Sequence, residues 1–308
     1  MTPNPRLSAC CLVNHYNYKQ FVEATVDSAV DQSRSLDEIL VVDDGSCEED
    51  LAEVRRVALK HPEVQLLEKP NGGQLSCFEA GINASKSDVV FFLDADDRWD
   101  PRYVETVMAL LERRPDIDFV ATNDRREFSD GRTEVTERSD RDLGYSITRS
   151  LKNGGAFLGQ PTSCLAIRRE ILERIFPLPQ VRGWRTCADE ALVYGSSLVG
   201  ARKFFLAEPL VRYRIHGENH WFGKKYSASD RLLRGLEVQR LVEVLRRREG
   251  LPACLAHIAH HEFRTIESPT SEDYSAYQRL VGSSSIGWRR KLRIKTALFT
   301  WHRLGMRT

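Results

Sequence analysis

The chain has 308 residues, enough to bury one sizeable core with an accessory element, or two small domains. Charged residues make up 29% of it, but acids and bases nearly cancel to a net charge of +1, so we expect no nucleic-acid partner. Its apolar runs are far shorter than the roughly 20 residues of a membrane-spanning helix, and the N-terminal residues do not resemble a secretory signal. The seven cysteines lack C-x-x-C spacing, which favours reduced, buried thiols and a cytoplasmic location.

Short apolar runs alternate with helical patterns over residues 1–120. Five strands are expected, at Ala9–Val13, Ile39–Val42, Val64–Leu67, Val89–Leu93 and Ile117–Ala121. Amphipathic helices separate them, the first over Phe21–Val30. Ser46 and Ser76 begin capping-box patterns, and Asp100 is expected to cap the helix after the fourth strand. This rhythm predicts an α/β fold with a doubly wound, mostly parallel sheet flanked by helices.

The second half of the chain changes character twice. From Arg125 to Arg149 it is polar and charged, which indicates a long loop or an exposed hairpin. Ordered segments follow at 156–167 and 188–199, with a helix expected at 168–175 and one or two strands within 203–213. Beyond these, helices are rich in Leu and Arg. We therefore expect two units, residues 1–226 and a helical, basic C-terminal extension, residues 227–308.

Polar clusters follow three of the predicted strands: Asn14-His15-Tyr16, Asp43-Asp44 and Asp94-Ala95-Asp96-Asp97. In a parallel sheet these ends meet at one edge, where ligands bind. Two carboxylates at i and i+2 can hold a divalent cation, which can neutralise a diphosphate. The acidic cluster alone can equally be a turn with a helix cap, and Asp-Gly-Ser after Asp43 is ordinary turn chemistry. No G-x-G-x-x-G follows the first strand and no P-loop motif occurs, which disfavours dinucleotide binding and P-loop chemistry.

Six segments in order resemble the family 2 glycosyltransferases, which have the GT-A fold. They are Ser8–Asn17, Glu38–Ser46, Lys69–Gln74, Asp88–Asp97, Cys187–Glu190 and Tyr213–Asn219. The resemblance implies inverting, metal-dependent transfer of a single sugar from a nucleotide-diphosphate sugar to a hydroxyl of a glycan, lipid-linked or small-molecule acceptor. Cell-surface glycan or glycoconjugate assembly is the expected setting. The chain lacks the Q-x-x-R-W segment of the processive synthases, so a non-processive enzyme is expected.

The resemblance also implies which residues bind the donor. Asn14 and Tyr16 match the loop that contacts the nucleotide base, where an aromatic ring can lie against it. Asp44 matches the carboxylate that hydrogen-bonds the base. Asp94 and Asp96 match the D-x-D pair, which contacts the ribose and, through Mn²⁺ or Mg²⁺, the diphosphate.

The remaining roles implied by the resemblance concern the metal and the proton transfer. Asp97 extends the acidic edge, and His216 matches a segment near the phosphates, so Asp96 and His216 are the expected metal ligands. A structural histidine is the alternative for His216. Asp189 matches the general base, with Glu190 in reserve; the alternative is a surface carboxylate on a helix. Because a base must be ionised near neutral pH, we expect Asp189 to be hydrogen-bonded rather than desolvated.

Two other functions remain open on the sequence. A nucleotidyltransferase would also use acidic metal ligands, but it would normally show a Gly-rich phosphate loop where this chain has Asn14-His15-Tyr16-Asn17. A sugar-nucleotide-binding protein without turnover is the other, and the D-x-D pair and Asp189 argue against it. Specificity for sugar, base and acceptor is expected to depend on side chains within 125–184 and near Trp221.

The C-terminal helix carries an apolar face within a basic segment. Residues 274–308 contain eight Lys or Arg residues and no Asp or Glu. The apolar face comprises Ile294, Ala297, Leu298 and Trp301. A helix of this kind can lie on an anionic membrane, so residues 286–304 are a candidate for peripheral membrane contact on the cytoplasmic face. The alternative is that this face docks on the catalytic domain, with the basic side chains in solvent.

Overall fold

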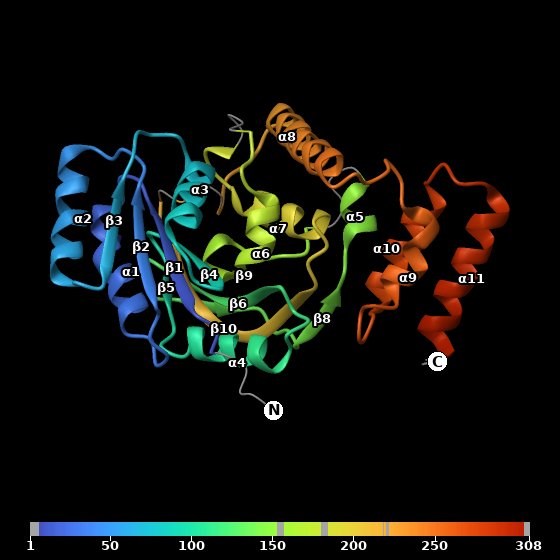
Figure 1. Ribbon diagram of the computed structural model, residues 1–308, viewed down its shortest axis with the longest axis horizontal. Helices are drawn as coiled ribbons and strands as arrows, with labels where there is room; N and C mark the ends of the chain where they lie inside the picture. The colour runs from blue at the N-terminus through green and yellow to red at the C-terminus, as the bar shows by residue number, and fades with distance from the viewer. Residues whose placement is uncertain (1–5, 153–156, 180–183, 218, 220–221, 305–308) are drawn as a thin grey trace.

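A computed structural model describes residues 6–152, 157–179, 184–217, 219 and 222–304. A central sheet carries helices on both faces, and a group of helices follows at the C-terminal end (Figure 1). The four N-terminal strands are parallel and lie in the order β3-β2-β1-β4. They are β1 (Ala9–His15), β2 (Glu38–Asp43), β3 (Val64–Glu68) and β4 (Val89–Asp94), joined by α1 (Lys19–Val30), α2 (Glu48–Lys60) and α3 (Gln74–Ala84). The first four predicted strands and the first helix are confirmed, with ends that differ by at most two residues, and the fifth predicted strand is present but extends to Phe128.

Beyond β4 the sheet is mixed rather than mostly parallel. β9 pairs antiparallel with both β4 and β6, β6 pairs parallel with β10, and β10 pairs antiparallel with β5 and β8. The bounds are β5 (Arg98–Trp99), β6 (Phe119–Phe128), β7 (Thr133–Val135), β8 (Arg141–Gly144), β9 (Leu165–Arg168) and β10 (Lys203–Ile215). An apolar run in the sequence indicates that a strand is covered on both faces, but it does not indicate whether the strand runs parallel or antiparallel to its neighbours.

The polar segment 125–149 is only partly the loop or hairpin expected from sequence. β6 continues into it, β7 returns as the second strand of an exposed hairpin, and β8 joins the edge of β10. The remaining elements before the C-terminal group are helical. They are α4 (Tyr103–Arg113), α5 (Ile147–Leu151), η1 (Thr162–Cys164), α6 (Arg169–Ile175), α7 (Asp189–Leu198) and α8 (Ala228–Arg248).

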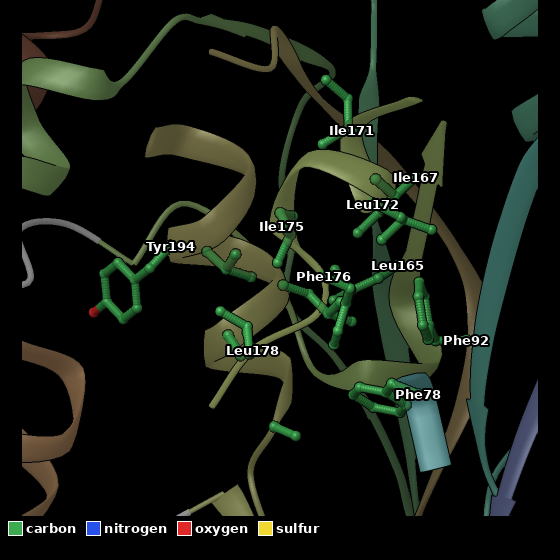
Figure 2. Close-up of a cluster of buried hydrophobic side chains, with 14 of the residues drawn as sticks. Phe78, Phe92, Leu165, Ile167, Ile171, Leu172, Ile175, Phe176, Leu178 and Tyr194 are labelled. Carbon is green, nitrogen blue, oxygen red and sulfur yellow. The ribbon is translucent and has the colours of Figure 1, made fainter. Parts of the chain in front are cut away.

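Two apolar cores form because strand side chains alternate between the faces of the sheet. Cys11 and Val13 of β1 face the core covered by α1, α2 and α4, whereas Leu12 faces the core covered by α3, α6, α7 and α8. Figure 2 shows part of the second core, where Phe78 of α3 and Phe92 of β4 meet with their ring centroids 5.0 Å apart.

Helix α8 lies after the expected domain boundary at residue 226 but contributes to the second core. Its four buried residues, Val238, Leu241, Val242 and Leu245, belong to the same apolar cluster as Phe92. The helices that follow form a third cluster of their own. We therefore propose that the C-terminal unit begins after α8, near residue 250, rather than at residue 227.

The helix caps predicted at Ser46, Ser76 and Asp100 are wrong. α2 begins at Glu48 after Cys47, and the Ser46 hydroxyl instead donates to Asp43 Oδ1 over 2.6 Å. Ser76 lies inside α3, whose N-cap is Gly73, and its hydroxyl donates to the Gly73 carbonyl. α4 begins at Tyr103, so Asp100 is not its N-cap. Each polar side chain has a tertiary or turn partner that the local pattern does not show.

The C-terminal group contains four short elements. They are η3 (Ala256–Ile258), α9 (Ala259–Phe263), α10 (Ser271–Gly282) and α11 (Trp288–Leu304). Asp273 of α10 joins this group to the sheet, with ion pairs to Arg141 (2.5 Å) and Arg149 (3.3 Å). Ile294 and Leu298 of α11 are buried against α9 and α10. The apolar face predicted from sequence therefore docks on neighbouring helices. Within the described residues, no helix combines the length and apolarity needed to cross a membrane.

Candidate active site

The ends of β1, β2 and β4 meet at one edge of the sheet, as predicted. Asn14 of β1 lies in register with Asp94 of β4, and His15 lies in register with Asp43 of β2. Because these strands are neighbours in a parallel ladder, their carboxyl ends place the three polar clusters side by side. A cavity of about 880 Å³ opens beside them. Among the residues that line it are Asn14, Tyr16, Asp44, Asp94, Asp96 and Asp189.

The Asp43 carboxylate accepts the hydrogen bonds that hold the turn at the end of β2. His15 Nδ1 donates to Asp43 Oδ1 over 2.8 Å, and the N–H groups of Gly45 and Ser46 donate to Asp43 Oδ2. His15 Nε2 accepts from the Tyr18 N–H, which leaves Nδ1 as the donor. Burial raises the pKa of Asp43, but the hydrogen bonds from His15 and Ser46 outweigh it and hold the pKa below its ordinary value. Asp43 is therefore structural, and Asp44 is the carboxylate that faces the cavity.

Asp44 binds the loop that follows β3. Lys69 Nζ donates to Oδ1 over 2.5 Å, and the N–H groups of Gly72 and Gly73 donate to Oδ1 and Oδ2 over 2.8 and 2.7 Å. The Cys77 thiol also hydrogen-bonds to this carboxylate, so Asp44 is held by four groups where it lines the cavity. Gly73 has φ +89°, and a Cβ there would lie 2.4 Å from the Arg185 Cα. Only glycine allows the loop to approach the segment around Arg185 this closely.

Tyr16 presents its ring to the cavity. Its side chain is 47% exposed, although large aromatic residues are usually much more buried. It belongs to the loop between β1 and α1, where Asn17, with φ +55°, accepts the Cys47 N–H through its side chain. Asn14, one strand residue earlier, carries a buried Oδ1 for which the described residues provide no hydrogen-bond partner. Both positions thus offer an unused surface or atom to a ligand.

Asp94, the last residue of β4, forms an acidic cluster with Asp96 and Asp97. One carboxylate oxygen from each lies within 4.8 Å of the others. Burial, and then the charge of Asp96, raises the pKa of Asp94 to about 7. Three crowded carboxylates repel one another, and oxygen ligands of this kind suit Mg²⁺ or Mn²⁺. The donor set therefore fits a hard divalent cation.

Asp97 and His216 occupy different positions around this cluster. The Asp97 carboxylate accepts from the Ser163 hydroxyl (2.6 Å) and the Arg214 N–H (3.0 Å), and it does not line the cavity. It lies behind the acidic edge instead of extending it into the cavity. His216 Nε2 lies 3.0 Å from Asp96 Oδ2, and the ring packs 4.7 Å from the Phe21 ring. The structure brings the two predicted metal ligands, Asp96 and His216, into direct contact.

Asp189 is the first residue of α7 and lines the same cavity as Asn14, Tyr16 and Asp44. Its side chain is half-buried. Burial, and then the negative charge of Glu190, raises its pKa to about 7, which outweighs backbone hydrogen bonds and the nearby Arg234. Asp189 accepts backbone hydrogen bonds, as expected, but it is also desolvated, which was not expected. Its pKa near neutrality suits a proton acceptor, because general bases work best with a pKa close to the operating pH.

Gln74 joins the two sides of the cavity, a role that the sequence did not indicate. Its Nε2 donates to Asp94 Oδ1 over 2.9 Å, and its Oε1 accepts the Ala188 N–H over 2.8 Å. Its own N–H donates to the Arg185 carbonyl. One side chain thus links the acidic edge to the residue that precedes Asp189. Gln74 belongs to a segment that resembles the family, but spacing alone cannot show what its amide contacts.

Arg234 of α8 holds the segment before α7 and was also missed. Its Nη2 donates to the Cys187 carbonyl over 2.6 Å, its Nε lies 2.9 Å from Glu190 Oε2, and its guanidinium lies 4.2 Å from the centre of the buried Trp184 ring. Cys187 has φ +56°, a conformation that costs about 1–2 kcal/mol for a non-glycine residue. Asp189 and Glu190 both line the cavity, but Glu190 is paired with Arg234, which makes Asp189 the better candidate for proton transfer. Trp221, expected near the pocket, lies outside the described residues.

Comparisons with known proteins identify the family. The profile described as Glycosyl transferase family 2 matches residues 10–176, more than half of the chain. The chain belongs to glycosyl transferase family 2. An uncharacterised glycosyltransferase of Nostoc sp. is 31% identical over 227 residues, which cover 71% of this chain and 68% of that protein. Chondroitin synthase of Pasteurella multocida is 29% identical over 116 residues, 38% of this chain and 12% of the synthase. The protein is thus a glycosyltransferase, as predicted.

Solved structures show the same fold. TarS residues 1–349 of S. aureus, in complex with UDP-GlcNAc, match with a TM-score of 0.62 at 14% identity, covering 97% of this chain and 92% of that one. A mannosyltransferase of Pyrobaculum calidifontis, in complex with GDP-Man and Mn²⁺, matches with a TM-score of 0.53 at 16% identity, covering 99% and 89%. The predicted GT-A fold, an α/β sheet flanked by helices with helices at the C-terminal end, is confirmed.

Proposed function

We propose that this family 2 glycosyltransferase transfers one sugar from a nucleotide-diphosphate sugar to a hydroxyl acceptor, with inversion and with a divalent cation. One observation carries the proposal: a single cavity has the acidic edge of Asp94 and Asp96 on one side and Asp189 on the other, linked by Gln74. An inverting transfer needs both parts, because the acceptor attacks opposite the leaving diphosphate and must lose its proton.

The donor side supports a nucleotide sugar. Tyr16 offers an exposed ring to a base, Asn14 offers an unused oxygen, and Asp44 lines the same cavity. Structures that share the fold hold UDP-GlcNAc in one case and GDP-Man with Mn²⁺ in another. We propose that these three residues bind the base and that Asp94 contacts the ribose, with Asp97 supporting the cluster from behind.

We propose that Asp96 and His216, beside Asp94, hold Mg²⁺ or Mn²⁺. A cation there would neutralise the negative charge that develops on the leaving diphosphate. The residues themselves are positioned without it: His216 contacts Asp96, and Gln74 fixes the orientation of Asp94. The crowding of three carboxylates is the feature that favours a cation over a hydrogen-bonded turn.

We propose that Asp189 accepts the proton of the acceptor hydroxyl. Its raised pKa makes it a stronger base than an ordinary aspartate, and its place at the start of α7 points to the acceptor side of the cavity. The acceptor is proposed to be a glycan, a lipid-linked or a small molecule in cell-surface glycan or glycoconjugate assembly. All seven cysteines are free, and four of them are buried, which supports the proposed cytoplasmic location.

The test is calorimetric binding of UDP, GDP, dTDP and CDP compounds, each with and without Mn²⁺. We expect one nucleotide to bind tightly only with the metal, and Asp96→Ala to abolish this binding. Asp88→Ala is the matched control, because Asp88 lies at the opposite end of β4 and is exposed. Failure of every nucleotide to bind the folded protein would contradict the proposed donor chemistry. Metal-independent binding would contradict the cation site alone.

A further inference from the structure

Helix α11 carries a second apolar stripe that is not the one predicted from sequence. Ile294 and Leu298 face the neighbouring helices and are buried. Trp288, Leu292 and Phe299 are 70%, 61% and 50% exposed. At about 100° per residue, these three side chains fall within about 40° of one another around the helix axis. Single exposed apolar residues are common, but three in line on one helix form a patch that marks an interaction site.

The charged residues in the segment that carries this outer stripe are all basic. Residues 274–308 contain eight Lys or Arg residues and no acid. Arg303, Arg289 and Arg293 are exposed and lie about 60°, 100° and 140° from Trp288 around the axis, all on one flank. Across the described part of the chain, no acidic side chain forms an ion pair with α11. The stripe is therefore an apolar ridge with uncompensated positive charge beside it.

A comparison within the protein shows that this combination is specific to α11. Helix α8 also exposes leucines, namely Leu232, Leu233 and Leu236. Acidic residues accompany them, since Asp230 precedes them and Glu237 follows. The α8 surface thus carries charges of both signs, whereas the α11 surface carries only positive charge and complements a negatively charged partner. A second copy of the chain is disfavoured at this face, because a symmetric contact would bring two basic surfaces together.

We propose that the outer face of α11 binds the surface of an anionic lipid bilayer. Trp288, Leu292 and Phe299 enter the boundary between headgroups and acyl chains, and the flanking arginines contact anionic headgroups. Helix α11 lies at the end of the molecule opposite α2 (Figure 1), so this contact attaches the protein by one end. The surface replaces the Ile294 and Leu298 face as the source of peripheral membrane contact through residues 286–304. It does not depend on the proposed sugar transfer, and binding and turnover are measured separately.

The test is co-sedimentation of the full-length protein with vesicles of phosphatidylcholine alone or mixed with phosphatidylglycerol. We expect binding only to the anionic vesicles, weakened by added salt. The triple variant Arg289→Gln, Arg293→Gln and Arg303→Gln should weaken binding about 100-fold, since each basic side chain contributes about five-fold. The triple variant Trp288→Ser, Leu292→Ser and Phe299→Ser keeps the charge and should weaken binding at least about ten-fold.

A matched control replaces exposed apolar residues elsewhere, with Leu59→Ser and Val135→Ser, and should bind as the wild type does. Because all substituted side chains are exposed, the thermal unfolding midpoint should change little in any variant. The proposal is overturned if the wild type fails to sediment with anionic vesicles at low salt, or if the serine variant binds as tightly as the wild type. It is also overturned if sedimentation velocity shows a dimer that this variant dissociates while vesicles bind neither protein.

Discussion

The two sides of the cavity are built in different ways. On the donor side, Asp94 and Asp96 follow a strand that is hydrogen-bonded in register to its neighbour, and Asp43 ties the next strand end to His15. On the side of the proposed general base, Asp189 begins helix α7 after a segment in which Cys187 has φ +56°. The sheet positions the first set, whereas a few side-chain contacts position the second.

This difference identifies the contacts on which catalysis depends most. A residue at the end of a ladder is held by many backbone hydrogen bonds, so the loss of one neighbour moves it little. The segment before Asp189 is held by Gln74, 114 residues away from Ala188, and by Arg234, 47 residues away from Cys187. Substitutions of Asp189 and Arg234 should therefore reduce turnover and leave nucleotide binding intact, whereas substitution of Gln74, which also contacts Asp94, should affect both.

Removal of the proposed base should have the largest effect. Asp189→Asn keeps the shape of the side chain but cannot accept the acceptor proton, so kcat should fall about a thousand-fold. The affinity for the nucleotide, measured by calorimetry, should be unchanged. Glu190→Gln is the control, and it should retain most activity because Glu190 is paired with Arg234. A larger loss in Glu190→Gln than in Asp189→Asn would reverse the assignment of the base.

Loss of the link across the cavity should come next. Gln74→Ala removes the hydrogen bonds to Asp94 and to Ala188, and kcat should fall about 100-fold because the base is no longer held in place. Unlike Asp189→Asn, this variant should also weaken metal-dependent nucleotide binding. Gln65→Ala, on the exposed surface of β3, should change neither quantity. If Gln74→Ala turns over as fast as the wild type, the link through Gln74 is not needed to position Asp94 or Asp189.

The pH dependence tests the desolvation of Asp189. The carboxyl must be ionised to accept a proton, and its pKa is raised to about 7. Activity should therefore rise with pH, and kcat at pH 6 should be about ten-fold below its plateau. The measurement is kcat at saturating donor and metal, so that the titration of the donor side does not enter. A flat profile from pH 5 to 8 would contradict the raised pKa.

Substitution of Arg234 should have the smallest effect, and it tests how strongly the side-chain contacts around Asp189 control its pKa. Its charge lowers the pKa of Asp189, so Arg234→Ala should move the acidic limb of the pH profile to higher pH and reduce kcat a few-fold at pH 7. Arg234→Lys retains a charge, and the limb should move less. Arg231→Ala, exposed on the same helix, is the control. If the acidic limb of the pH profile does not move in Arg234→Ala, then Arg234 has a purely structural role beside Trp184.

The parts of the fold that sequence predicted are those with local signals. The first four strands, the helices between them and the convergence of the three polar clusters follow from apolar runs that end in charged residues. The direction of β9 and the extent of β10 were not predicted, because pairing depends on which strands become neighbours. The caps expected at Ser46 and Ser76 were wrong, since their hydroxyls have partners at Asp43 and Gly73.

The sequence by itself determined the α/β architecture, the family resemblance and the position of the acidic edge, because these depend on periodicity and on residues adjacent in the chain. The tertiary structure alone decided which face of α11 remains exposed, what surrounds Asp189 and which side chains join the two sides of the cavity. Burial and distant contacts set those properties. A carboxyl group's pKa and a helix's free surface depend on what packs against them, and neighbours in sequence do not specify that.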